Sequence, residues 1–132
     1  MLLEIPLNNS SNPVIGVVLF ENKNSTKEMA ALIDTGLSAM LYISEEKLFE
    51  HLGYFPETKT KYIYTLSGKI EQRYFSGAIK LQAHDKIYYG DIIIGEGIHV
   101  LIGMQLLKQC KKFLIDFEKN KFFIEVKDSE YD

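Results

Sequence analysis

Hydrophobic and polar residues along the chain fall into many short apolar or alternating segments, and turn residues separate these segments. Short runs rich in β-branched and aromatic residues, bounded by Gly, Asn, Asp and Ser, predict β-strands. The predicted strands cover residues 14–21, 28–34, 41–43, 61–66, 70–75, 78–83, 87–94, 98–102, 113–117 and 121–126, with turns at 21–25, 67–69, 84–86, 95–97 and 118–120. Many short strands of this kind predict a mostly-β barrel or sandwich.

Two short segments have the features of helices. Ser44 can cap a helix over residues 45–52, because acidic residues follow it in the first turn and Gly53 provides a stop. Residues 104–110 predict a second short helix, with Cys110 on its apolar inner face. We therefore expect one or two short helices beside the strands.

The composition is that of an ordinary globular protein. The chain has 132 residues, of which 46% are hydrophobic and 25% charged, so a single domain over residues 1–132 is expected. The acidic end of the chain, from about residue 127 to 132, is expected to fray. The formal net charge of −3 provides no basic surface for nucleic acid, and nucleic-acid binding is not expected.

The cysteines and histidines of the chain limit which disulfides, metal sites and cofactors are possible. Cys110 is the only cysteine, so no intrachain disulfide can form and a reducing compartment is favoured. The three histidines, His51, His84 and His99, have no metal-ligand spacing, and neither a metal nor an organic cofactor is expected. The start of the chain does not resemble a signal peptide, and no apolar run approaches the ~20 residues of a membrane helix. We expect a cytoplasmic protein without a membrane partner.

The segment that most clearly suggests a catalytic role is Asp34-Thr35-Gly36, which follows the apolar run 31–33. Asp34 could simply end a strand and accept hydrogen bonds from turn amides, as Asp often does. Alternatively, its carboxylate could serve in general acid–base catalysis, with Gly36 allowing close approach of backbone and water. The motif alone does not decide between these interpretations.

A second segment adds weight to the catalytic interpretation. Residues 100–107 are an apolar run that ends in Gly103 and continues as an amphipathic segment. Asp34-Thr35-Gly36 followed by Leu101-Ile102-Gly103 resembles the single-lobe, retropepsin-like (clan AA) aspartic proteases of the retroviral type. Residues 101–117 are similar to small stand-alone prokaryotic members of this clan. The resemblance implies a closed, barrel-like acid-protease fold and a homodimer that hydrolyses a peptide or protein substrate.

The resemblance also implies roles for individual residues. Asp34 of each protomer would form a catalytic dyad with its motif partners Thr35 and Gly36, and Leu101-Ile102-Gly103 would pack beneath the active-site loop and support it. The hairpin 61–75, with its tip at 67–69, would be a flap that closes over the substrate. The residues expected to bind substrate are Leu37, Ser38, Ser67, Gly68 and Lys69.

The sequence also departs from the retroviral pattern. Leu37 stands where the well-studied members carry a small Ala, and it would narrow the substrate groove. Retroviral enzymes pair an Arg with an Asp at the positions held here by Met104 and Ser38, so that ion pair is missing from both sides. These departures keep a second hypothesis open, in which the chain is a non-catalytic retropepsin-like module for peptide binding or association.

Overall fold

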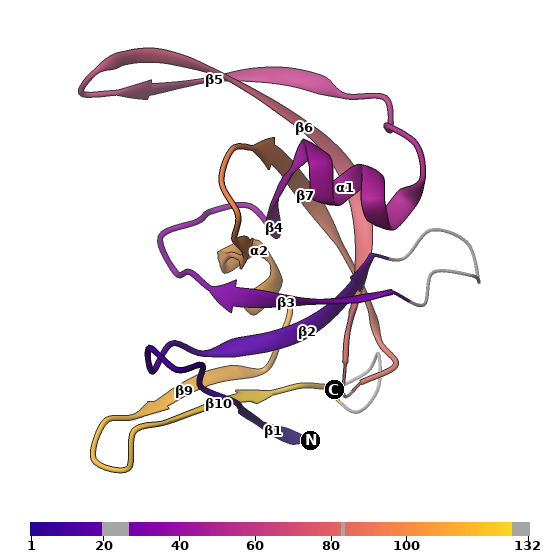
Figure 1. Ribbon diagram of the computed structural model, residues 1–132. Helices are drawn as coiled ribbons and strands as arrows, with labels where there is room; N and C mark the ends of the chain where they lie inside the picture. Colours follow the sequence, from indigo (N-terminus) through magenta and orange to yellow (C-terminus); the bar gives the residue numbers. More distant parts are fainter. Residues whose placement is uncertain (20–26, 83, 128–132) are drawn as a thin grey trace.

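The residues that the structure describes form ten strands and two short helices (Figure 1). The computed structural model describes residues 1–19, 27–82 and 84–127. The strands are β1 (Leu2–Ile5), β2 (Val14–Leu19), β3 (Glu28–Ile33), β4 (Leu41–Ser44), β5 (Lys59–Thr65), β6 (Gly68–Leu81), β7 (Ile87–Gly95), β8 (Val100–Ile102), β9 (Lys112–Asp116) and β10 (Lys121–Glu125), and the helices are α1 (Glu45–Leu52) and α2 (Met104–Leu107). The predicted fold class, mostly β with two short helices, is confirmed.

Within the described part of the chain, the larger sheet has seven strands in the order β2-β3-β8-β4-β7-β6-β5. An additional antiparallel pairing of β2 with β6 brings the sheet back on itself. The strands therefore form a nearly closed ring rather than a strict barrel, and β5 remains outside the ring as the outer strand of a hairpin. In Figure 1 this β5–β6 hairpin arches over β4 and α1.

Two parallel pairings set the position of the candidate site. β3 runs parallel to β8, with Ile33 beside Ile102, and β4 runs parallel to β7. Because parallel strands end at the same edge of a sheet, Asp34 and Gly103 emerge side by side at the ends of β3 and β8. Residues 69 positions apart in the chain are thus brought together by backbone pairing alone.

The structure corrects the predicted pattern around the hairpin formed by β5 and β6. The strands predicted at 70–75 and 78–83 are one long strand, β6, whose first half pairs with β5 and whose second half pairs with β7. Gly77 in the middle of β6 does not break the strand, because it pairs with Gly90 of β7. A glycine is found here because a larger side chain would collide with Ile92. The turn of the hairpin is Leu66-Ser67, since Thr65 already pairs with Gly68. Gly68 has a φ of 116°, a left-handed conformation that favours glycine.

The smaller sheet has the order β1-β10-β9 and places the first strand beside β10. β1 was not predicted, because its four residues mix Glu with apolar side chains and stand directly before Pro6. It is held by antiparallel pairing with β10, and its Ile5 is buried in the core with Ile124 of β10. A short polar-interrupted segment becomes a strand here because a partner strand supplies its hydrogen bonds.

The helices confirm most of their predicted boundaries. Ser44 caps α1 by accepting a hydrogen bond from the Lys47 N–H (3.2 Å), and Gly53 ends it with a φ of 80°. α2 ends at Leu107, three residues before its predicted end at Cys110. Cys110 is nevertheless buried, as predicted for an inner face. No helix in the described residues is long and apolar enough to cross a membrane.

Some predictions concern positions for which the structure gives no description. These are the last two residues of the predicted strand 14–21, the turn 21–25, the last residue of the predicted strand 78–83, and residues 128–132 of the acidic tail.

Candidate active site

Asp34 begins the loop 34–40, which connects β3 to β4. Its backbone N–H donates a hydrogen bond to the Ile102 carbonyl (2.8 Å), so the β3–β8 ladder extends to this residue. The Gly36 N–H donates to Asp34 Oδ1 (2.9 Å), and the Leu37 N–H donates to the Asp34 carbonyl (3.1 Å). The backbone of the motif therefore holds one carboxylate oxygen in place, and the structure shows no hydrogen bond from a described residue to the other oxygen.

The start of α2 holds this loop through hydrogen bonds from its backbone amides to carbonyl groups of the loop. The Gly103 N–H donates to the Met40 carbonyl (3.0 Å), and the Met104 N–H donates to the Leu37 carbonyl (2.7 Å). A side chain at position 103 would not fit, because its Cβ would lie 2.5 Å from the Leu37 carbonyl oxygen and closer still to that of Ala39. The glycine is thus required for space, since its φ of −113° and ψ of −174° suit any residue. The backbone of Ile102 and Gly103 therefore lies directly against the loop that carries Asp34, and Leu101 pairs with Leu32 and Tyr42 in the strands that flank the loop.

The loop residues differ in exposure. Thr35, Gly36 and Ser38 are exposed, Asp34 is half-buried, and Leu37 is half-buried with its Cγ next to Gly103. An accessible carboxylate whose orientation is set by backbone amides can act as a base or as a hydrogen-bond acceptor for a ligand. Within residues 1–19, 27–82 and 84–127, no group of three His, Cys, Asp or Glu side chains could hold a metal ion.

The hairpin residues Ser67, Gly68 and Lys69 lie apart from this loop. The Thr65 hydroxyl donates to the Gly68 carbonyl (2.9 Å) and accepts from the Ser67 N–H (3.2 Å), and the Lys69 ammonium lies 3.9 Å from the centre of the Tyr62 ring. These contacts stay within the hairpin, whose turn projects away from the rest of the chain in Figure 1. The structure thus brings together residues 34–38 and 101–103 but not 67–69.

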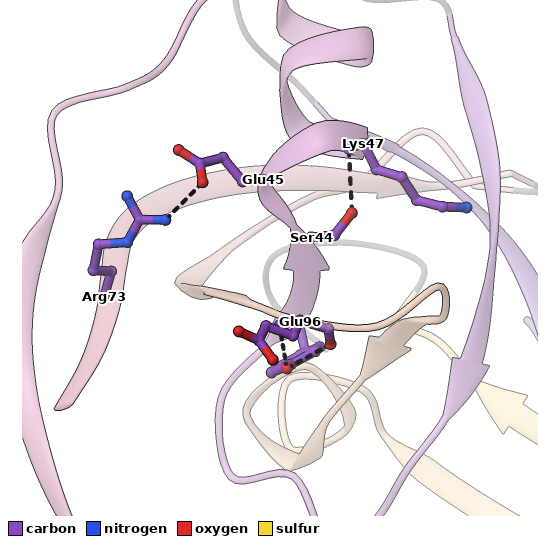
Figure 2. Close-up of polar contacts among 6 residues, drawn as sticks. Ser44, Glu45, Lys47, Arg73 and Glu96 are labelled. Atoms are coloured by element: carbon purple, nitrogen blue, oxygen red, sulfur yellow. Dashed lines mark hydrogen bonds and ion pairs between the residues drawn. The ribbon is translucent and has the colours of Figure 1, made fainter. Parts of the chain in front are cut away.

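Two polar contacts, one made by α1 and one by β4, were not predicted from the sequence (Figure 2). Arg73 of β6 forms an ion pair with Glu45 of α1 (3.2 Å), which ties the base of the hairpin to the helix. The Tyr42 hydroxyl donates to the Glu96 carbonyl and accepts from the Glu96 N–H, each at 2.8 Å, which fixes the β7–β8 loop. The partners are 28 and 54 residues apart in the sequence, and no local pattern marks such pairs.

A cavity of about 350 Å³ opens elsewhere on the molecule. It lies between the α1–β5 loop and β6, and its lining includes Tyr54, Pro56, Phe75 and Ala78. None of the residues 34–38 or 101–103 contributes to it. This cavity is therefore separate from the candidate site.

Comparison with known proteins supports the fold. The structure is similar to the crystal structure of a retropepsin-like aspartic protease from Rickettsia conorii, with a TM-score of 0.67 and 20% sequence identity over 96% of this chain and 90% of that chain. No model of a known protein family matches the sequence, and no curated protein matches it. The chain therefore has a retropepsin-like fold, and at this level of identity the similarity concerns the fold alone.

Proposed function

We propose that the protein is a homodimeric aspartic endopeptidase whose catalytic dyad consists of one Asp34 from each protomer. The observation that carries the proposal is the geometry of Asp34 at the end of β3. Its carboxylate accepts a hydrogen bond from the Gly36 N–H, and its loop is supported by the first turn of α2. This arrangement occurs on a fold similar to that of a retropepsin-like aspartic protease.

The mechanism follows from two carboxyl groups at close range. Two such groups share one proton, because both cannot be ionised when they are a few ångströms apart. The ionised carboxylate takes a proton from a water molecule as the water oxygen bonds to the carbonyl carbon of the scissile peptide, and the protonated carboxyl donates its proton to the carbonyl oxygen. The tetrahedral intermediate then breaks its C–N bond: the first carboxyl gives its proton to the leaving nitrogen, and the second takes one back from a hydroxyl of the intermediate. The hydrogen bond from Gly36 orients Oδ1 and leaves Oδ2 of Asp34 for this chemistry. The reaction needs no metal and no organic cofactor.

The remaining assignments belong to the same proposal. The domain spans residues 1–132, and Thr35 connects the two active-site loops across the dimer axis. Leu37 and Ser38 contact the substrate from the loop, and Ser67, Gly68 and Lys69 contact it when the hairpin closes. A single buried thiol fits a reducing compartment such as the cytoplasm.

The test is a cleavage profile on a complex peptide mixture, read by mass spectrometry. Wild type and Asp34→Asn are compared from acidic to neutral pH, at protein concentrations that maintain a dimer. The proposal predicts cuts by the wild type that the variant does not make. A dimeric wild type without Asp34-dependent cuts would contradict it and would favour the non-catalytic binding module.

A further inference from the structure

The outer edge of β9 is unpaired in the described chain. β9 is the last strand of the three-stranded sheet, and only β10 pairs with it. Its apolar side chains are unusually accessible, with Leu114 43%, Ile115 40% and the following Phe117 85% exposed. Proteins commonly protect an exposed, apolar strand edge, because it can pair with another chain.

The direction of the backbone groups follows from the β9–β10 pairing. The Glu125 carbonyl of β10 accepts a hydrogen bond from the Lys111 N–H (2.8 Å), so Glu125 faces β9. Its register partner Lys112 therefore faces β10. Hydrogen-bonding direction alternates along a strand, so Leu114 and Asp116 also face β10.

The intervening residues of β9 face the other way. The N–H and C=O groups of Phe113 and Ile115 are therefore aimed at the free edge. If a β9 strand from another copy pairs antiparallel with this edge, the backbone groups of Phe113 and Ile115 must bond to residues that face the free edge in that copy, among them its own Phe113 and Ile115. Only a few registers meet this condition.

Charge selects one of these registers when the second strand is β9 of another copy. With a two-fold axis at Leu114, Phe113 lies opposite the partner's Ile115, and Lys112 lies opposite the partner's Asp116. Shifting the axis to Phe113 or Ile115 places a charged side chain opposite leucine instead. The axis at Leu114 thus gives hydrogen-bond partners to the free N–H and C=O groups of Phe113 and Ile115. It also places opposite charges beside each other at both ends and covers the exposed Ile115 side chain.

We propose that two copies of this chain pair through their β9 edges about an axis at Leu114. The two three-stranded sheets then join into one sheet of order β1-β10-β9-β9-β10-β1, without exchange of strands between protomers. The interface deepens the proposed function, because a dyad requires a second Asp34. Its structural basis, however, is independent of catalysis.

A charge exchange tests the interface and its register. Lys112→Asp places two acidic side chains opposite each other at both ends, and Asp116→Lys places two basic ones there. Each variant alone should dimerise about tenfold or more weakly than wild type in sedimentation at low salt. An equimolar mixture of the two should associate again as a heterodimer, because both end pairs become opposite in charge. Lys59→Asp, on an exposed position of β5, is the matched control and should dimerise as wild type does.

Several results would overturn the proposal. These are a monomeric wild type at all concentrations, unchanged dimerisation of both charge variants, or no association in their mixture. Because Asp116 Oδ1 also accepts from the Lys119 N–H (3.0 Å), Leu114→Lys provides a further variant, which places two ammonium groups at the axis and should likewise dimerise more weakly than wild type. If the mixture associates but cleaves no peptide, the interface holds and the proposed function fails.

Discussion

Replacing Gly103 by alanine is the most informative single perturbation of the candidate site. The new Cβ would lie 2.5 Å from the Leu37 carbonyl oxygen and 2.7 Å from Leu37 Cγ, and it would be closer still to the Ala39 carbonyl oxygen. Because a Cβ atom essentially never lies within 3.0 Å of a heavy atom outside its own and the neighbouring residues, the loop 34–40 and the start of α2 must move apart by at least half an ångström. The two nearest atoms are the backbone carbonyl oxygens of Ala39 and Leu37, so a rotation of the Leu37 side chain alone cannot relieve the clash.

The expected cost has two parts. Overpacking a well-packed site costs about 1–3 kcal/mol. Moving the loop also weakens the hydrogen bonds from the Gly103 and Met104 amides to loop carbonyls, each of which contributes about 1 kcal/mol. We therefore expect Gly103→Ala to lower the free energy of unfolding by about 2–4 kcal/mol. Under the proposed function, a displacement of Asp34 on the scale of 1 Å also lowers the cleavage rate by up to about 10²-fold.

Urea denaturation at a fixed protein concentration measures the loss, since dimerisation would otherwise change the apparent stability. The control is Gly36→Ala in the same loop, whose Cβ would come no closer than 3.2 Å to another atom, Asp34 Oδ1. We expect it to cost less than about 1 kcal/mol. If Gly103→Ala were as stable as Gly36→Ala, the reasoning that α2 supports the loop through close packing would be refuted.

Three further changes test other parts of the structure. Ser44→Ala removes the cap that accepts from the Lys47 N–H and should cost about 1 kcal/mol of stability, measured by thermal or urea unfolding. Tyr42→Phe removes both hydrogen bonds to the Glu96 backbone and should speed amide hydrogen exchange in the β7–β8 loop, while the exchange of α1 stays unchanged. Burial raises the pKa of the Cys110 thiol, so the unfolded chain releases this proton at lower pH than the folded one. The free energy of unfolding should therefore fall as the pH rises above the ordinary thiol pKa of about 9, and it should fall less in Cys110→Ala. If the wild type and Cys110→Ala showed the same pH dependence of stability, the raised pKa of Cys110 would be contradicted.

The sequence predicted those elements whose signals are local. The cap at Ser44 and the stop at Gly53 define α1, and both follow from the conformational preferences of single residues. Most strands follow from short apolar runs. The proximity of Asp34 and Gly103 was inferred from a family resemblance, and the structure explains it by the parallel pairing of β3 with β8.

Features that depend on distant partners could not be predicted in this way. β1 is a strand because β10 pairs with it, and its own residues carry little β-pattern. β6 is continuous because β5 pairs with its first half and β7 with its second half. In the sequence, Gly77 suggested a break between two shorter strands. The Arg73–Glu45 ion pair and the Tyr42–Glu96 contact join segments far apart in the chain and have no local signal.

The most direct test of the central claim is to mix wild type with Asp34→Asn and measure peptide cleavage at constant total protein. If each active site needs Asp34 from both protomers, activity follows the square of the wild-type fraction. An equimolar, re-equilibrated mixture should then retain about one quarter of the wild-type activity. If one protomer sufficed for catalysis, the activity would follow the wild-type fraction linearly and remain at about one half, and a dyad shared across the dimer would be contradicted.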